Sequence, residues 1–130
     1  MESKRKTAAS IMDRFARRTG LVDSSQQQSQ TRYLWTDAFA VCNFLGLAST
    51  ETDPSRKEYF ESLAYRLIVS VHNILGRHSL DHPNAALRQQ WISGLPENQG
   101  MSHPTIGGLR IGKKSPERGV NEPYDRDAEW

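Results

Sequence analysis

Residues 56–76 carry the most regular hydrophobic pattern in the chain, RKEYFESLAYRLIVSVHNILG. Large apolar side chains recur there every three or four positions, at Phe60, Leu63, Leu67, Val71 and Ile74. This period matches the turn of an α-helix and places these side chains along one face. A second apolar row lies beside the first, so more than one neighbouring element can pack against the helix. The sequence therefore predicts a long core helix over residues 55–75.

A second apolar segment, YLWTDAFAVCNFLGL at residues 33–47, precedes this helix. It is apolar on nearly every side, which is typical of a helix surrounded by other helices. The segment between the two is short and polar and contains Pro54, so we expect an antiparallel αα-hairpin. A third, shorter helix is predicted over residues 7–19, where Ile11, Met12 and Phe15 share one side.

The apolar residues are unevenly distributed along the 130-residue chain. Nearly all long apolar runs lie before residue 76, whereas the remainder is rich in Gly, Pro, Asn and charge. We therefore predict an all-α fold, with a helical region at residues 1–76 and a loop-rich tail at residues 77–130. Within that tail, residues 83–91 are compatible with one short helix. The polar residues 23–31 are predicted to form a loop.

Three helices and a polar tail offer little cover for a helix that is apolar all round. Two interpretations follow from this shortage. Either another chain covers the hairpin, or the sequence is the opening portion of a larger protein. We expect the second.

The formal net charge of +2 is too small to indicate a nucleic-acid partner. The basic residues nevertheless cluster near the N-terminus, at Lys4, Arg5, Lys6, Arg14, Arg17 and Arg18. We interpret this cluster as a solvated helix face. The alternative is nucleic-acid binding, which predicts a steep salt dependence of affinity.

Cys42 is the single cysteine, so the chain cannot form an internal disulfide or a thiolate metal cluster. A chain with one cysteine and no disulfide fits a reducing compartment, and we expect a cytoplasmic protein. No apolar run approaches the length of about 18 residues that a transmembrane helix needs. The first ten residues also lack the hydrophobic region of a secretory signal. We therefore expect no membrane partner.

The hairpin resembles a known architecture in its two apolar helices, RYLWTDAFAVCNFLGL and LAYRLIVSVHNILGRH, and in the short TETDPSRKEYF connection. It is similar to one helical hairpin of the six-hairpin glycosidase-like (α/α)6 toroids, which include N-acylglucosamine 2-epimerase-like proteins and several glycoside hydrolases. The later WISGL, HPTIGGLRIGK and DRDAEW segments look like cavity-side loops of uncharacterised bacterial and fungal proteins of that kind. The resemblance implies an N-terminal fragment of an incomplete toroid, whose parent binds or converts carbohydrate.

Glycoside hydrolysis and epimerisation both need acid and base groups around the sugar, and sugar pockets favour aromatic faces. By resemblance, the catalytic candidates are Asp37 and His78. The substrate-binding candidates are Trp35, His103 and Arg110. Asp125, Asp127 and Glu129 supply further carboxylates near the end of the sequence.

Each candidate also has a structural interpretation. Asp37 is either in the first turn of its helix or in a polar cavity, and the first turn is favoured. Trp35 is either a core residue or a sugar platform, and the core is favoured. His78 and His82 have a metal-chelating spacing, but Pro83 favours a loop, so no metal site is predicted. Residues 107–112 are rich in glycine and match no phosphate-binding fingerprint, so an ordinary turn is expected.

The leading functional hypothesis is therefore a fragment of a carbohydrate-active toroid, inactive by itself and without a cofactor. Its expected ligand in a complete protein is a carbohydrate. The alternative is a non-enzymatic helical interaction protein that docks through its apolar hairpin, as an oligomer or on a partner.

Overall fold

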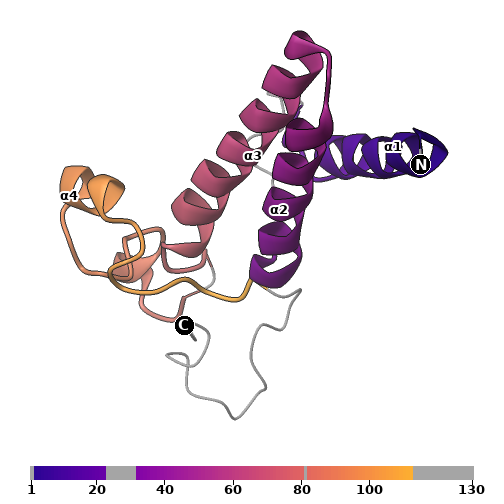
Figure 1. Ribbon diagram of the computed structural model, residues 1–130. Coiled ribbons are helices and arrows are strands. Elements are labelled where there is room, and N and C mark those ends of the chain that lie inside the picture. Colours follow the sequence, from indigo (N-terminus) through magenta and orange to yellow (C-terminus); the bar gives the residue numbers. More distant parts are fainter. Residues whose placement is uncertain (1, 23–31, 81, 113–130) are drawn as a thin grey trace. The chain divides into compact units, whose positions relative to one another are not determined.

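The protein is described by a computed structural model that covers residues 2–22, 32–80 and 82–112 (Figure 1). Its helices, in chain order, are α1 (Glu2–Arg18), α2 (Leu34–Thr50), α3 (Pro54–Leu75), the short 3₁₀ helix η2 (Ala85–Leu87) and α4 (Glu97–Ser102). The only β-type pairing among these residues is an isolated antiparallel bridge between Arg77 and Trp91. The all-α fold class is confirmed.

The observed α3 agrees closely with the predicted helix over residues 55–75, and α2 extends three residues beyond its predicted end. The first helix differs more, because α1 begins at Glu2 instead of residue 7. Arg5 lies in this added stretch and donates to Leu47 and Thr50 of α2, so a tertiary contact supports the early turns. The predicted loop at residues 23–31 and the tail from residue 113 lie outside the described residues.

The chain divides into two compact units, and the division differs from the predicted boundary at residue 76. Unit 1 comprises Met1–Thr31 and Thr36–Ile68. Unit 2 comprises Arg32–Trp35 and Val69–Trp130. The start of α2 and the end of α3 belong to unit 2 because later residues pair with them. The Leu34 N–H donates to the Ile111 carbonyl, and the Arg110 N–H donates to the Leu75 carbonyl.

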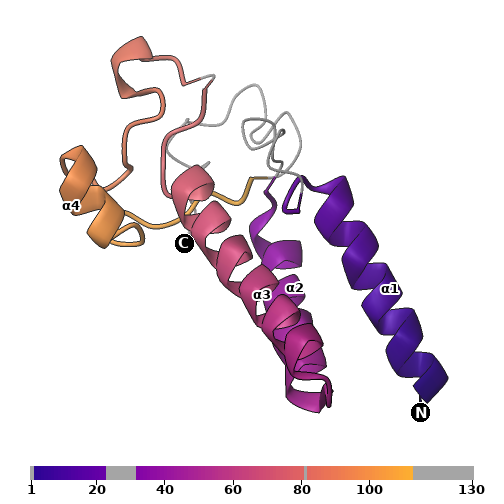
Figure 2. The same cartoon turned by 90° about the horizontal axis from the view of Figure 1, so that it is seen from above.

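In unit 1, α1 packs on the hairpin, whose two helices lie side by side and antiparallel (Figures 1 and 2). The rings of Phe15 and Phe44 approach to 6.4 Å between centroids. The core of this unit contains buried apolar side chains from all three helices, including Met12, Ala16, Phe44, Leu47, Phe60, Leu63 and Leu67. The face predicted for α3 is therefore the face that is buried.

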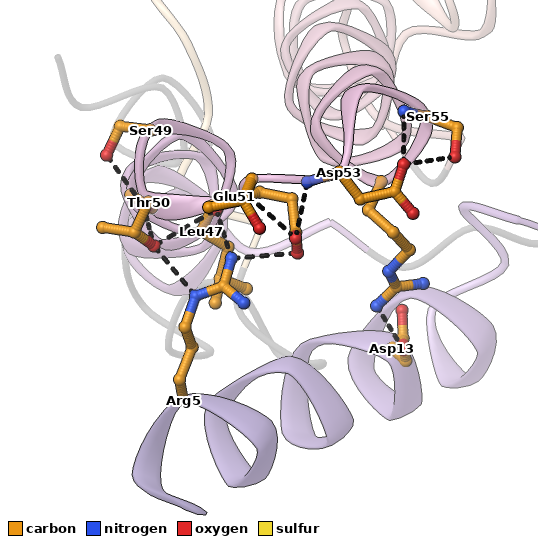
Figure 3. A network of polar contacts seen from close by, with 11 residues as sticks. Arg5, Asp13, Leu47, Ser49, Thr50, Glu51, Asp53 and Ser55 are labelled. Atoms are coloured by element: carbon orange, nitrogen blue, oxygen red, sulfur yellow. Dashed lines mark hydrogen bonds and ion pairs between the residues drawn. The ribbon is translucent and has the colours of Figure 1, made fainter. Parts of the chain in front are cut away.

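The hairpin turn is held by a polar network in unit 1 (Figure 3). Arg5 donates through Nη2 to the Leu47 carbonyl at 3.1 Å and to Glu51 Oε2 at 2.9 Å. Glu51 Oε1 accepts the backbone N–H groups of Thr52 and Asp53. The Asp53 N–H, followed by Arg5, lowers the pKa of Glu51. The first helix is thus joined to the end of α2 and to the turn.

The start of α3 is capped by its own sequence. Asp53 accepts the backbone N–H of Ser55 at 3.0 Å and the Ser55 hydroxyl at 2.9 Å. These bonds lower the pKa of Asp53, with the Ser55 hydroxyl as the largest cause. Pro54 occupies the first helical position, where the missing N–H has no helical partner to lose. Asp53 and Pro54 together start the helix sharply.

Burial along α2 can be tested with two leucines of the same helix. Leu47 is 7% exposed and Leu45 is 48% exposed. We expect Leu47→Ala to lower the free energy of unfolding by about 2–5 kcal/mol, because it leaves a cavity in the core. Leu45→Ala is the matched control, with an expected change of about 0.5 kcal/mol or less. Urea unfolding of dilute protein measures both, and equal losses would contradict the burial assigned here.

Candidate functional site

Asp37, a catalytic candidate, lies in the first turn of α2 and is 2% exposed. An acidic side chain in this position is favoured by the positive end of the helix dipole. The structure therefore agrees with the favoured first-turn interpretation. A group so deeply buried has no solvent-facing surface to offer a sugar, and its catalytic assignment stays a prediction.

Trp35, a substrate-binding candidate, is exposed. Its side chain is 60% accessible, so the favoured core interpretation is wrong. Its ring lies 5.8 Å from that of Tyr33, centroid to centroid, with the planes inclined at 47°. The residue stands at the second position of α2. The exposed Trp35 ring, supported by the half-buried Tyr33 ring, is a surface that can stack on an apolar ligand face.

Arg110, another substrate-binding candidate, is buried. It caps the C-terminal end of α3, although it lies more than thirty residues later in the sequence. Its Nε donates to the Arg77 carbonyl at 2.7 Å and its Nη2 to the Ile74 carbonyl at 3.0 Å. The last carbonyls of a helix have no partner within the helix, and a cation there is also favoured by the dipole. Arg110 therefore has a clear structural role in unit 2. Its part in substrate binding stays a prediction.

His78 and His82 lie in a loop, as expected, with ring centroids 4.9 Å apart. The backbone of His78 pairs with Gln89 and Gln90, which holds the loop against the segment that follows η2. Burial, followed by the charges of His82 and Arg110, lowers the pKa of His78. No group of three or more metal-binding side chains is found within residues 2–22, 32–80 and 82–112.

His103, the remaining candidate, follows the last residue of α4 and is exposed. Its backbone N–H donates to the carbonyls of Gln99 and Gly100. The fold thus places Trp35, His78, His103 and Arg110 in unit 2, and the hydrogen bonds of the last three hold the local structure. The carboxylates at residues 125, 127 and 129 lie outside the described residues.

Unit 2 contains a cluster of Arg77, Trp91 and Glu97 that the sequence did not predict. Arg77 lies over the Trp91 ring, with its guanidinium carbon 3.9 Å from the ring centroid. The same guanidinium pairs with both oxygens of Glu97, at 2.6 and 3.0 Å, and lowers the pKa of that carboxyl. Gly100 lies against the indole so closely that a Cβ would collide with it. Arg77 lies 14 positions before Trp91 and 20 before Glu97, so no local sequence pattern indicates the cluster.

The predicted helix over residues 83–91 is only three residues long. Asn84 caps η2 by accepting the Ala86 N–H, and the helical path then ends. Gln89 adopts a positive φ of 62°, and Gln90 pairs with His78 instead of continuing a helix. Trp91 is consequently a buried anchor of the loop region, 2% exposed.

The outer face of α2 in unit 1 is an uncharged surface. We define it by its exposed residues Ala38, Phe39, Cys42, Leu45, Gly46 and Ser49. At 100° per residue these positions fall within about a third of the helix circumference. Phe39 is 73% exposed and Leu45 is 48% exposed. A row of apolar side chains left open on one helix is a surface that another apolar surface can cover.

Comparison with known proteins finds no match to any family model, to any curated protein or to any solved structure. Within the described part of the chain, no helix combines the length and the apolar character that would let it cross a bilayer. The functional argument therefore depends on the chain's own surfaces.

The lowered pKa of His78 predicts a pH-dependent stability. In the unfolded chain the imidazole titrates near its ordinary pKa of 6.5, whereas the folded protein favours the neutral ring. The unfolded state therefore binds the proton more readily, and the contribution to stability is complete above pH 6.5 and is lost as the pH falls below it. We expect the urea midpoint to fall between about pH 7.5 and 5.5.

Replacing His78 with Gln should flatten this decline. His103→Gln is the matched control, because the side chain of His103 is exposed. The comparison stays above the range in which carboxylates titrate. An identical decline in wild type and His78→Gln would mean that His78 does not cause it.

Proposed function

We propose that this chain is a helical interaction module that associates with a second copy of itself through the outer face of α2. The observation that carries the proposal is the exposure of Phe39 and Leu45 on a helix face without charge. Asp37 is the only charged residue of α2, and it is buried. Without charges, the face has no group that would select a partner of opposite charge or repel its own copy.

The order of residues along this face supports a two-fold pair centred on Cys42. Phe39 and Leu45 lie three positions before and after Cys42, and Ala38 and Gly46 lie four positions before and after it. In an antiparallel pair of α2 helices, Phe39 of one copy would meet Leu45 of the other, and Ala38 would meet Gly46. An isologous interface requires this kind of self-complementarity.

The small residues of the face would allow the two helices to approach closely. Ala38, Cys42 and Gly46 recur every four residues, and nothing lies within 4 Å of the position that a Cβ on Gly46 would take. Helix axes separated by about 8 Å would bring facing Cα atoms within the reach of a disulfide. Because Cys42 is the only cysteine and is exposed, it can report the pairing.

Sedimentation equilibrium tests the association. We expect a monomer–dimer equilibrium in the wild type and at least tenfold weaker association in Phe39→Glu, because the dimer would bury an unpaired carboxylate. Ile106→Glu is the matched control, because Ile106 is a comparably exposed apolar residue at 66% and lies in unit 2. Mild oxidation should cross-link Cys42 in the wild type and in the control, and much less in Phe39→Glu.

Two outcomes would overturn the proposal. One is a chain that remains monomeric at every accessible concentration. The other is an oligomer whose stability is unchanged by Phe39→Glu, since that oligomer would use another surface. Circular dichroism of each variant separates lost association from lost folding.

A second candidate is carbohydrate binding, which the resemblance to six-hairpin toroids implies. The observation that favours it is the exposed Trp35 ring beside Tyr33. Sugar rings have apolar faces that stack on exposed aromatic side chains. Asp37 and Arg110 are buried, whereas Trp35 and His103 are exposed and His78 is partly exposed, so these three are the candidates that a sugar could reach.

A titration with a panel of neutral oligosaccharides tests this candidate. We expect the indole NMR signal of Trp35 to shift, and the shifts elsewhere in unit 2 to disappear in Trp35→Ala. Leu45→Glu is the control that should bind sugar normally, because Leu45 lies ten residues, or about 15 Å, along α2 from Trp35. If no sugar moves the Trp35 signal, the carbohydrate candidate fails while the dimer proposal is unaffected.

A further inference from the structure

A broad groove of about 810 Å³ lies in unit 1 along α1. Seven of its eight lining residues come from α1 and one from the first turn of α3. They are Lys6, Ala9, Ser10, Asp13, Arg14, Arg17, Arg18 and Arg56. The lining thus contains five cations and one carboxylate. The whole chain carries a formal net charge of only +2, so the positive charge is concentrated at this groove.

The single carboxylate of the groove is already engaged. Asp13 accepts a hydrogen bond from the Tyr59 hydroxyl at 3.0 Å, and its other oxygen lies 4.0 Å from Arg56 Nη2. The guanidinium of Arg56 also lies over the Phe60 ring, 4.8 Å from the centroid. These contacts hold Arg56 at the wall of the groove, where its side chain remains 44% exposed.

Four cations of the groove have no such engagement. Among the described residues, no ion pair or side-chain hydrogen bond is made by Lys6, Arg14, Arg17 or Arg18. Arg5 of the same helix differs, because its guanidinium is used in the network at the hairpin turn. Arg5 therefore has a structural role, whereas Lys6, Arg14, Arg17 and Arg18 are available to bind an anion.

The available cations extend along the helix instead of converging on a point. Lys6, Ser10, Arg14 and Arg17 follow one another at intervals of four, four and three residues, so they share one face. With a rise of 1.5 Å per residue, the row spans about 16 Å. A single phosphate group cannot reach both ends of such a row. A linear chain of phosphates can contact its members in turn.

The residue types favour phosphate over other anions. Four of the five cations are arginines, whose planar guanidinium donates two parallel hydrogen bonds to a phosphate. The hydroxyl of Ser10 lies between Lys6 and Arg14 in the row and is a neutral donor to phosphate oxygens. No aromatic residue lines the groove, so the surface offers contacts to a backbone and no platform for base recognition.

We propose that this groove binds a linear chain of phosphates, such as the backbone of a single-stranded nucleic acid, without sequence preference. The expectation of no nucleic-acid partner rested on the small net charge of the whole chain. Affinity for a polyanion depends on the cations that contact phosphates, and the fold gathers these on one face. The proposal is independent of the outer face of α2.

The test measures binding of the full chain to a labelled single-stranded oligouridylate of about a dozen nucleotides, at several salt concentrations. Four phosphate contacts predict a slope of roughly −3 for log K against log salt. Arg14→Gln with Arg17→Gln should reduce the magnitude of that slope by about 1.4 and weaken binding roughly 25-fold at 0.1 M salt. Arg14→Lys with Arg17→Lys, which keeps the charge, should retain most of the slope.

The matched control is Lys57→Gln with Arg66→Gln. It removes the same charge from exposed positions of α3 in the same unit, outside the groove. Wild-type affinity and slope in this control, with loss in the groove variant, would support the proposal. Equal losses in both would show that net charge alone attracts the RNA and would overturn it.

Two further binding measurements, competition by polyphosphate and binding to lipid vesicles, identify the source of the phosphates. Inorganic polyphosphate that competes with the RNA would show that the phosphate chain suffices. RNA binding that polyphosphate does not displace would overturn the proposal, because contacts other than those to phosphates would then hold the RNA. Absence of RNA and polyphosphate binding at low salt would overturn the proposal, as would binding only to anionic phospholipid vesicles, because a membrane surface would then be the partner.

Discussion

The ends of helices must find donors for their last carbonyl groups, and two arginines meet this requirement in the present fold. In unit 1, Arg5 donates to the Leu47 carbonyl near the end of α2 and pairs with Glu51. In unit 2, Arg110 donates to the carbonyls of Ile74 and Arg77 where α3 ends. A buried carbonyl left without a donor costs about 1–3 kcal/mol, so these bonds strongly favour the observed arrangement.

Both arginines reach the end of a hairpin helix from a distant part of the chain. Arg5 joins α1 to the hairpin from more than forty residues away, and Arg110 joins the segment after α4 to the end of α3 from more than thirty. Apolar side chains of α1, α2 and α3 form the core of unit 1, and the arginines add hydrogen bonds at the ends of α2 and α3. In unit 2, the bonds of Arg110 attach the loop-rich region, whose Trp91 is buried, to the end of α3.

Burial within each unit also determines which surfaces remain for binding. The inner faces of α1, α2 and α3 form the core of unit 1, which leaves one face of α2 apolar and open and one face of α1 basic and open. The apolar face suits a like surface, because it carries no charge. The basic face suits a polyanion, because its cations are spaced along the helix. The two surfaces follow from the same packing, although their chemistry is opposite.

The fold class, the hairpin and the core face of α3 could be predicted because helical periodicity is a local property of the sequence. The start of α1 and the length of η2 could not, since the first depends on Arg5 reaching α2 and the second on Gln90 pairing with His78. The exposure of Trp35 was also missed. Periodicity shows that a side chain is apolar, but only the neighbouring elements decide whether it is covered.

The sequence by itself determined the helices of the hairpin, their antiparallel connection and the supply of basic residues in the first eighteen positions. The tertiary structure decided which of those basic residues are used and which are available. Arg5 is engaged in the turn network, whereas Arg14 and Arg17 line a groove to which Arg56 contributes from α3. The physical reason is that hydrogen bonds and charge density act through space, between residues that no local pattern connects.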